Sequence, residues 1–141
     1  MRNFSFHNPT QIHFGEGQIA KLGQEIPAGS RVLVTHGGGS IFQNGVWALV
    51  EAALAGFAVS RFAGIEANPQ FDTLLRAMEQ ARRDRCDFVL AIGGGSVIDA
   101  SKFIAAALCH AGDPLELLTG TPIQAALPLG CVLTLAATGS E

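Results

Sequence analysis

Charged residues are scarce in this 141-residue sequence, making up 15% of it, and lysines and arginines together number only nine. Apart from Arg82, Arg83 and Arg85, the basic residues are scattered. The sequence therefore lacks the positive surface by which proteins hold nucleic acid, and we expect no nucleic-acid partner. With 48% hydrophobic residues, the chain has enough apolar side chains to form one domain, or part of one, with a buried core.

Long hydrophobic runs are also missing. No uninterrupted apolar segment reaches the roughly 18 residues that a membrane-spanning helix needs. The N-terminal residues MRNFSFHNP lack the basic-then-apolar order of a signal peptide. We therefore expect a cytoplasmic protein with no membrane partner.

Cysteine and histidine, the usual soft metal ligands, are few. The three cysteines are odd in number and far apart, which is typical of reduced thiols rather than of a disulfide framework. The four histidines contain no pair at the i, i+4 spacing of a helical metal site. These residues are Cys86, Cys109, Cys131, His7, His13, His36 and His110. We expect no metal site within this chain.

The most informative segment that is present is Phe88–Lys102, FVLAIGGGSVIDASK. Five apolar residues typical of a buried strand run into three glycines and a serine, and then into a helical pattern. Glycines allow a ligand to approach the backbone closely, and the first turn of a helix has free N–H groups at the positive end of its dipole. This order predicts a phosphate-binding loop. A simpler interpretation is a sharp turn in which Ser96 and Asp99 form a capping box, and we expect both.

The same order occurs earlier in the chain. The apolar strand RVLVT (31–35) is followed by HGGGS (36–40) and by a helical run over about 46–55. Neither loop has the spacing of GxGxxG or of a P-loop. The first loop has no acidic residue to bind an adenosine ribose 2′-hydroxyl, so it favours NADP(H) over NAD(H). The alternative is a loop without a ligand.

The remaining segments complete an alternating α/β pattern. Two short alternating runs, Phe4/Phe6 and Ile12/Phe14, predict a pair of edge strands. We expect further strands over 58–62 and 128–137, helices over 17–26, 70–85 and 97–110, and a short helix that begins at Asp113-Pro114. The predicted fold class is α/β, a Rossmann-like parallel sheet flanked by helices, with the N-terminal edge-strand pair beside it.

Two of these helices differ in their apolar surface. Helix 70–85 has one apolar face, formed by Phe71, Leu74, Leu75, Met78 and Ala81. Helix 97–110 is apolar almost all round, which predicts burial on more than one side.

Taken together, GGGSVIDASKFIA, the earlier GGGS, Asn68-Pro69 and the terminal TLAATGSE closely resemble the iron-containing (group III) alcohol dehydrogenases. The resemblance is greatest to their NADPH-dependent butanol dehydrogenase and aldehyde reductase branch. It spans the whole chain but implies only the family's N-terminal NAD(P)-binding domain, residues 1–141. The C-terminal helical domain, in which one aspartate and three histidines hold a divalent metal, iron or zinc, would be absent from this chain.

The resemblance also implies roles for individual residues. Gly94, Gly95 and Ser96 would bind the cofactor pyrophosphate, with Asp99 beside it; Gly37, Gly38 and Ser40 would bind the adenosine ribose and its 2′-phosphate; Asn68 would lie near the adenosine; Thr134 and Thr138 would contact the nicotinamide half. No catalytic or metal-binding residue is assigned. The full-length protein would be a homo-oligomer that transfers hydride between nicotinamide and a small primary alcohol or aldehyde, and we expect this chain alone to be inactive.

Two other functions stay open. One is a dehydroquinate-synthase-like or glycerol-1-phosphate-dehydrogenase-like relative, whose nucleotide domain is similar; the terminal ATGSE and the absence of an acidic residue after the first core strand count against it. The other is a non-catalytic nucleotide-binding module.

Overall fold

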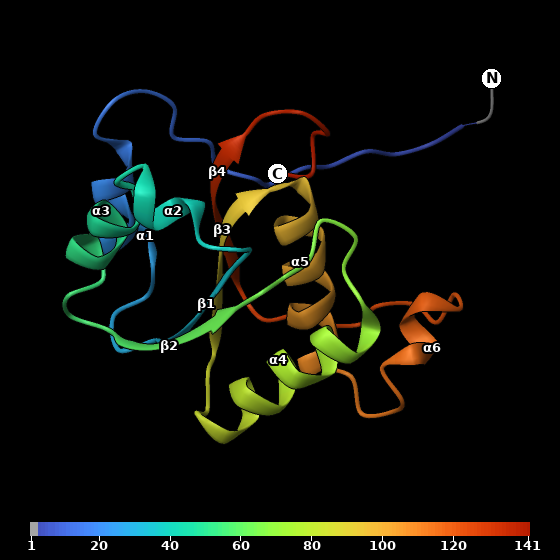
Figure 1. The fold of residues 1–141 in the computed structure, drawn as a ribbon. Helices are drawn as coiled ribbons and strands as arrows, with labels where there is room; N and C mark the ends of the chain where they lie inside the picture. The colour runs from blue at the N-terminus through green and yellow to red at the C-terminus, as the bar shows by residue number, and fades with distance from the viewer. Residues whose placement is uncertain (1–2) are drawn as a thin grey trace.

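Four strands form one parallel sheet in the computed structural model, which describes residues 3–141 (Figure 1). They are β1 (Arg31–His36), β2 (Ala58–Ala63), β3 (Phe88–Gly94) and β4 (Leu129–Leu135), in the spatial order β2-β1-β3-β4. The two central strands are buried along nearly their whole length, as continuous apolar runs in a parallel sheet should be. The predicted parallel, Rossmann-like sheet is confirmed.

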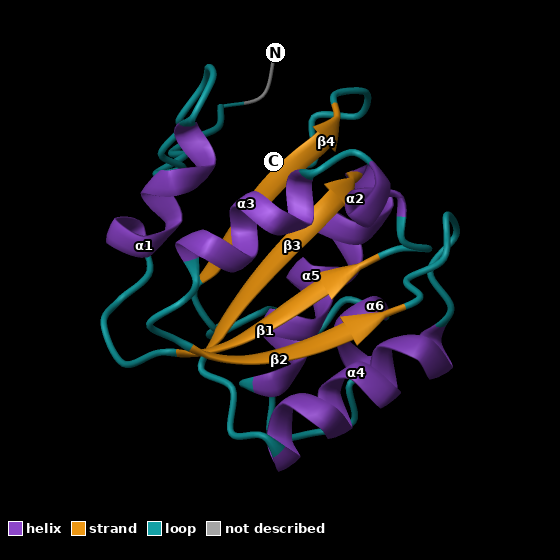
Figure 2. Ribbon diagram, turned by 60° about the vertical axis from the view of Figure 1, so that its left-hand side comes forward, coloured by secondary structure: helices purple, strands orange, loops and turns teal. Residues whose placement is uncertain are grey.

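Helices cover both faces of this sheet (Figure 2). One face packs against a 3-10 helix, η1 (Gln18–Lys21), and against α1 (Leu22–Glu25), α2 (Ser40–Gln43) and α3 (Val46–Ala53). The other packs against α4 (Phe71–Arg83) and α5 (Gly95–Leu108), and α6 (Leu115–Leu118) lies beyond them. Within the described residues, no helix combines the length and the apolar character needed to cross a membrane.

The order of the strands reverses direction at β1. The chain leaves β1 through α3 to reach β2 on one side, then returns through α4 to reach β3 on the other side of β1. Because crossovers between parallel strands are right-handed, the two connections lie on opposite faces of the sheet. The chain then leaves β3 through α5, on the face opposite α3, to reach β4. The segments that follow β1 and β3 therefore separate, and this leaves a crevice at the carboxyl ends of the two strands.

The predicted helices are present, although α4 has a different inner face from the one predicted. Leu74, Met78 and Ala81 are buried as expected, whereas Leu75 is 37% exposed. Thr73 lies inside because its hydroxyl donates a 2.6 Å hydrogen bond to Glu66 in the loop after β2.

The prediction that the helix after β3 is buried on more than one side is confirmed. Helix α5 packs on β3 and β4 and is crossed by α4. The segment before β4 joins it through a 3.0 Å bond from the Leu127 N–H to the Ala105 carbonyl. The short helix after Asp113 is also confirmed, and the Asp113 carboxylate caps it by accepting the Leu115 N–H at 2.9 Å.

The predicted pair of N-terminal edge strands is wrong. Residues 3–14 form no strand, and the side chains that were to define it are 76–95% exposed: Phe4, Phe6, Ile12 and Phe14. A two-stranded hairpin is at best marginally stable by itself, because each strand needs an apolar layer to cover one face. In residues 3–141 these four side chains meet no such layer.

The different inner face of α4 can be tested by truncation. Met78→Ala removes a side chain with 0% exposure and should lower the free energy of unfolding by about 2–5 kcal/mol. Leu75→Ala, on the same helix, should lower it by about 1 kcal/mol or less because its side chain is already partly in water. Urea denaturation monitored by circular dichroism compares the two variants, and equal losses would contradict the observed phase of the helix.

Candidate functional site

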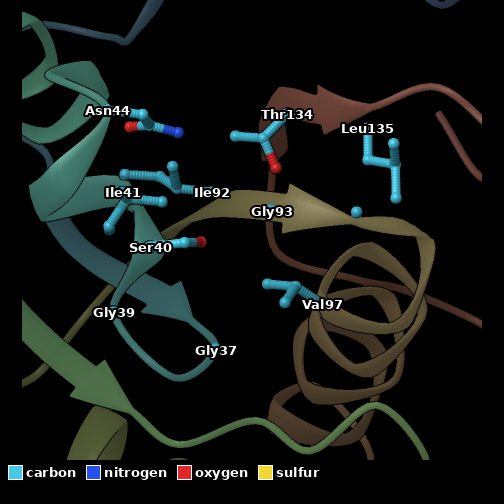
Figure 3. Close-up of a pocket in the computed structure, with 11 residues that line it drawn as sticks. Gly37, Gly39, Ser40, Ile41, Asn44, Ile92, Gly93, Val97, Thr134 and Leu135 are labelled. Atoms are coloured by element: carbon cyan, nitrogen blue, oxygen red, sulfur yellow. The ribbon is translucent and has the colours of Figure 1, made fainter.

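A cavity of about 330 Å³ opens at the crevice between the carboxyl ends of β1, β3 and β4 (Figure 3). Its apolar walls are Ile41, Ile92, Val97 and Leu135, its polar side chains are Ser40, Asn44 and Thr134, and its bare backbone belongs to Gly37, Gly39, Gly93 and Gly94. Both GGGS loops therefore reach one cavity, although they lie more than fifty residues apart in the chain. Parallel pairing brings them together, since it places the ends of β1 and β3 at the same edge.

The ten predicted site residues occupy different places around this cavity. Four of them line it: Gly37, Ser40, Gly94 and Thr134. Gly38 continues the first loop and is exposed, and Gly95 and Ser96 begin α5 next to the second loop. Thr138 lies beside Gly95, so that a Cβ added to Gly95 would collide with the Thr138 hydroxyl. Asn68 and Asp99 are exposed and do not line the cavity.

The first loop is shaped by the chain around it. Gly39 has φ +115°, a conformation that residues with a Cβ rarely adopt, and it precedes α2. The loop after β2 holds this region through bonds of 3.1 Å from the Gly64 and Ile65 N–H groups to the His36 carbonyl. Gly38 differs, because a Cβ there would meet no other atom within 4 Å. The space beside Gly38 is open to a ligand.

His36 is buried beneath this loop at 2% exposure. Its Nδ1 lies 3.0 Å from the Gly37 carbonyl, and its ring meets Phe42 edge to face at 5.3 Å between centroids. Burial lowers the pKa of His36, and the nearby Arg61 guanidinium lowers this pKa further. The imidazole is therefore neutral at pH 7 and gives the loop no positive charge. The donors that the first loop itself offers to an anion are therefore its backbone N–H groups and the Ser40 hydroxyl.

The second loop contains glycines of two kinds. At Gly93 a Cβ would lie only 2.6 Å from Cγ2 of the buried Val97, so packing within the protein excludes a side chain there. At Gly95 a Cβ would collide with the hydroxyl of the exposed Thr138, which would have to move. At Gly94 a Cβ would lie 3.7 Å from that of Leu135, which is an ordinary contact. Nothing in the described protein requires Gly94 to be glycine, and its bare backbone faces the cavity.

The predicted capping box at the start of α5 is wrong. Ser96 donates its hydroxyl to the Ala67 carbonyl at 2.6 Å, which ties α5 to the loop after β2. Asp99 is exposed, and no side chain caps the helix. The N–H groups of the first turn thus stay available at the positive end of the helix dipole, beside Gly94.

Thr134 owes its position to a β-bulge. The pairing of β3 with β4 passes from Gly93–Leu133 directly to Gly94–Leu135, which leaves Thr134 as the extra residue. A bulge redirects a side chain, and the Thr134 hydroxyl points into the cavity (Figure 3). Ser40 lines the same cavity, although the resemblance had placed these two residues at opposite halves of a cofactor.

Asn44 is a polar cavity residue that the sequence reasoning missed. Its side-chain oxygen accepts the Val46 N–H at 3.1 Å, and Figure 3 shows its amide nitrogen directed into the cavity. The turn dipeptide Asn44-Gly45 before a helical run was a signal that could have drawn attention to it.

The residues present do not fit a metal ion. Across residues 3–141, the structure contains no group of three or more histidine, cysteine, aspartate or glutamate side chains placed to hold one. The chemistry of the cavity is that of glycine backbone, helix N–H groups, hydroxyls and apolar walls, and this combination suits a phosphate-bearing organic ligand.

Comparison with known proteins identifies the family. The model of the iron-containing alcohol dehydrogenases matches residues 9–141. The chain belongs to this family. Among its relatives, the NADPH-dependent aldehyde reductase YqhD of Escherichia coli K12 is 50% identical over 145 residues, which cover 100% of this chain and 38% of the reductase. A probable NADH-dependent butanol dehydrogenase of Bacillus subtilis is 44% identical, with the same coverage of each chain.

Solved structures in the family agree with this fold. The crystal structure of E. coli YqhD superposes with a TM-score of 0.94 at 50% identity, covering 99% of this chain and 37% of that one. NADH-dependent butanol dehydrogenase A of Thermotoga maritima gives a TM-score of 0.91 at 43% identity, with 99% and 36% covered. The chain therefore spans between 36% and 38% of the length of these relatives.

The two kinds of glycine in the second loop predict different effects of added side chains. Gly93→Ala should lower the free energy of unfolding by about 1–3 kcal/mol, because the new methyl group would overlap with Val97. Gly94→Ala should change it by about 0.5 kcal/mol or less, since only an ordinary contact is added. Chemical denaturation of both variants measures this difference. Destabilisation by Gly94→Ala as large as that by Gly93→Ala would show that the protein itself requires both glycines.

Proposed function

We propose that residues 1–141 are the N-terminal NADP(H)-binding domain of a metal-dependent alcohol dehydrogenase or aldehyde reductase. The supporting observation is the single cavity shared by both GGGS loops in a member of the iron-containing alcohol dehydrogenase family. The substrate would be a small alcohol or aldehyde. A helical domain outside this chain would hold the divalent metal, since the described residues offer no ligand cluster.

The described residues suit the two phosphate-bearing parts of the cofactor, the pyrophosphate and the 2′-phosphate. The bare backbone of Gly94 and the uncapped first turn of α5 would bind the pyrophosphate. The open space at Gly38 and the Ser40 hydroxyl would receive the adenosine ribose with its 2′-phosphate. When bound, the nicotinamide supplies hydride chemistry. The part of this chain is to bind the dinucleotide and orient it.

The preference for NADP(H) is proposed from the first loop. HGGGS contains no carboxylate that would repel a 2′-phosphate or bind a free 2′-hydroxyl. Relatives are divided, because the E. coli reductase is named as NADPH-dependent and the B. subtilis dehydrogenase as NADH-dependent. The proposed preference for NADP(H) therefore rests on the residues of the first loop and not on the relatives.

The other two functions have less support. The relatives described above are named as reductases and dehydrogenases, which favours a redox function over a synthase-like one. The same names count against a non-catalytic module, since both of these relatives are named as enzymes.

Nucleotide titration tests the proposal directly. Isothermal calorimetry of the purified protein with NADPH and with NADH should show binding, with the tighter dissociation constant for NADPH. Failure of folded protein to bind either nucleotide would contradict the cofactor site. Tighter binding of NADH would contradict the role of the first loop in accepting a 2′-phosphate.

A charge placed in the first loop should reverse this preference. Gly38→Asp has room for its side chain, and its carboxylate should weaken NADPH binding at least about tenfold by repelling the 2′-phosphate. NADH binding should be retained or improved, because the carboxylate can accept a hydrogen bond from the ribose. Gly38→Asn is the matched control, with nearly the same shape and no charge. If Asn and Asp weaken NADPH binding equally, then steric exclusion rather than charge governs this position.

A further inference from the structure

Two hydroxyl groups meet in the interior of the protein, away from the cavity. Thr35 on β1 and Ser101 on α5 are both 0% exposed, and their oxygens lie 2.6 Å apart. Ser101 donates its proton to the Val97 carbonyl at 2.6 Å, so in the 2.6 Å contact with Thr35 it accepts. The Thr35 hydroxyl also lies 3.5 Å from the Leu90 carbonyl on β3, a longer contact. The result is a directed chain of hydrogen bonds from Thr35 through Ser101 to Val97.

This chain is not required for filling the core. Valine has nearly the shape of threonine, and the three residues before Thr35 on β1 are the apolar Val32, Leu33 and Val34. A buried hydroxyl is unfavourable unless it is hydrogen-bonded. A serine in a helix commonly donates a hydrogen bond to the carbonyl four residues earlier. This local preference explains the bond of Ser101 to Val97, but it does not explain why a threonine stands at position 35 on a separate strand. The pair gives β1 and α5 a directional connection that apolar packing alone does not provide.

The connection joins the elements that carry the two glycine loops. Thr35 precedes Gly37 by two residues, and Ser101 lies one helical turn after Val97. The Val97 side chain reaches both loops, because its Cγ2 lies 3.9 Å from a Cβ built on Gly37 and 2.6 Å from one built on Gly93. Val97 also lines the cavity (Figure 3). The hydrogen-bonded chain therefore ends at a residue whose side chain lies next to both loops.

We propose that Thr35 and Ser101 are positioning residues that fix the separation of the two glycine loops, so that one dinucleotide can engage both at once. This inference rests on the proposed function. It assigns a functional role to two buried side chains that touch no ligand. A ligand that spans both loops gains from their correct spacing, because the second contact becomes intramolecular once the first has formed. A ligand that engages a single loop has no such gain.

The test compares NADPH, which spans both loops, with adenosine 2′-monophosphate, which would engage the first loop only. In Thr35→Val the dissociation constant for NADPH should rise about tenfold, while that for adenosine 2′-monophosphate should change by less than about twofold. Thr35→Ser keeps the hydroxyl, so this variant should bind NADPH about as tightly as the wild type does. Calorimetry gives the dissociation constant of NADPH, the tighter ligand. Ligand-observed NMR competition gives that of adenosine 2′-monophosphate, the weaker one.

The double variant Thr35→Val/Ser101→Ala separates positioning from stability. Its thermal stability should approach that of the wild type, because neither hydroxyl is left without its partner, while NADPH binding should stay weak. Three results would overturn the positioning role. In Thr35→Val, these are unchanged NADPH binding or an equal weakening of the binding of both ligands. In the double variant, it is a recovery of NADPH binding together with the recovery of stability. Failure of the wild type to bind NADPH would instead overturn the proposed function, and this inference with it.

Discussion

The parallel pairing of β1 with β3 is the constraint on which the site depends. His36 pairs with Ile92, so the two strands end side by side and the glycine loops begin at the same level. Right-handed crossovers then place α3, which follows β1, and α5, which follows β3, on opposite faces, so the two loops diverge. The cavity is thus a consequence of strand order, and the residues around it occupy an opening that the backbone topology creates.

Three loops from separate parts of the sequence are held together around this opening. The segment after β2 binds the first glycine loop through the His36 carbonyl and binds α5 through Ser96. Deeper in the core, Thr35 and Ser101 connect β1 to α5. Each bond joins elements that apolar packing alone could allow to slide, because hydrogen bonds are directional and hydrophobic contacts are not.

The two GGGS loops look alike in the sequence, yet the physical reason for glycine differs from one position to the next. Gly39 supplies a backbone conformation, and Gly93 and Gly95 make room for neighbouring side chains. Only Gly38 and Gly94 leave space that the described protein does not fill. The positions of greatest interest for a ligand are therefore those where a side chain would have been tolerated by the fold and is nevertheless absent.

The sequence by itself determined the strands, the main helices, the α/β class and the family, because these follow from short-range patterns of apolar residues and from a motif contained in a few residues. Tertiary structure decided the partner of Ser96, which is 29 residues away, the bulge that turns Thr134 into the cavity, and the side of α4 on which Leu75 lies. It also decided that the alternating residues 3–14 form no strand. These outcomes depend on which distant groups become neighbours, and local periodicity carries no information about that.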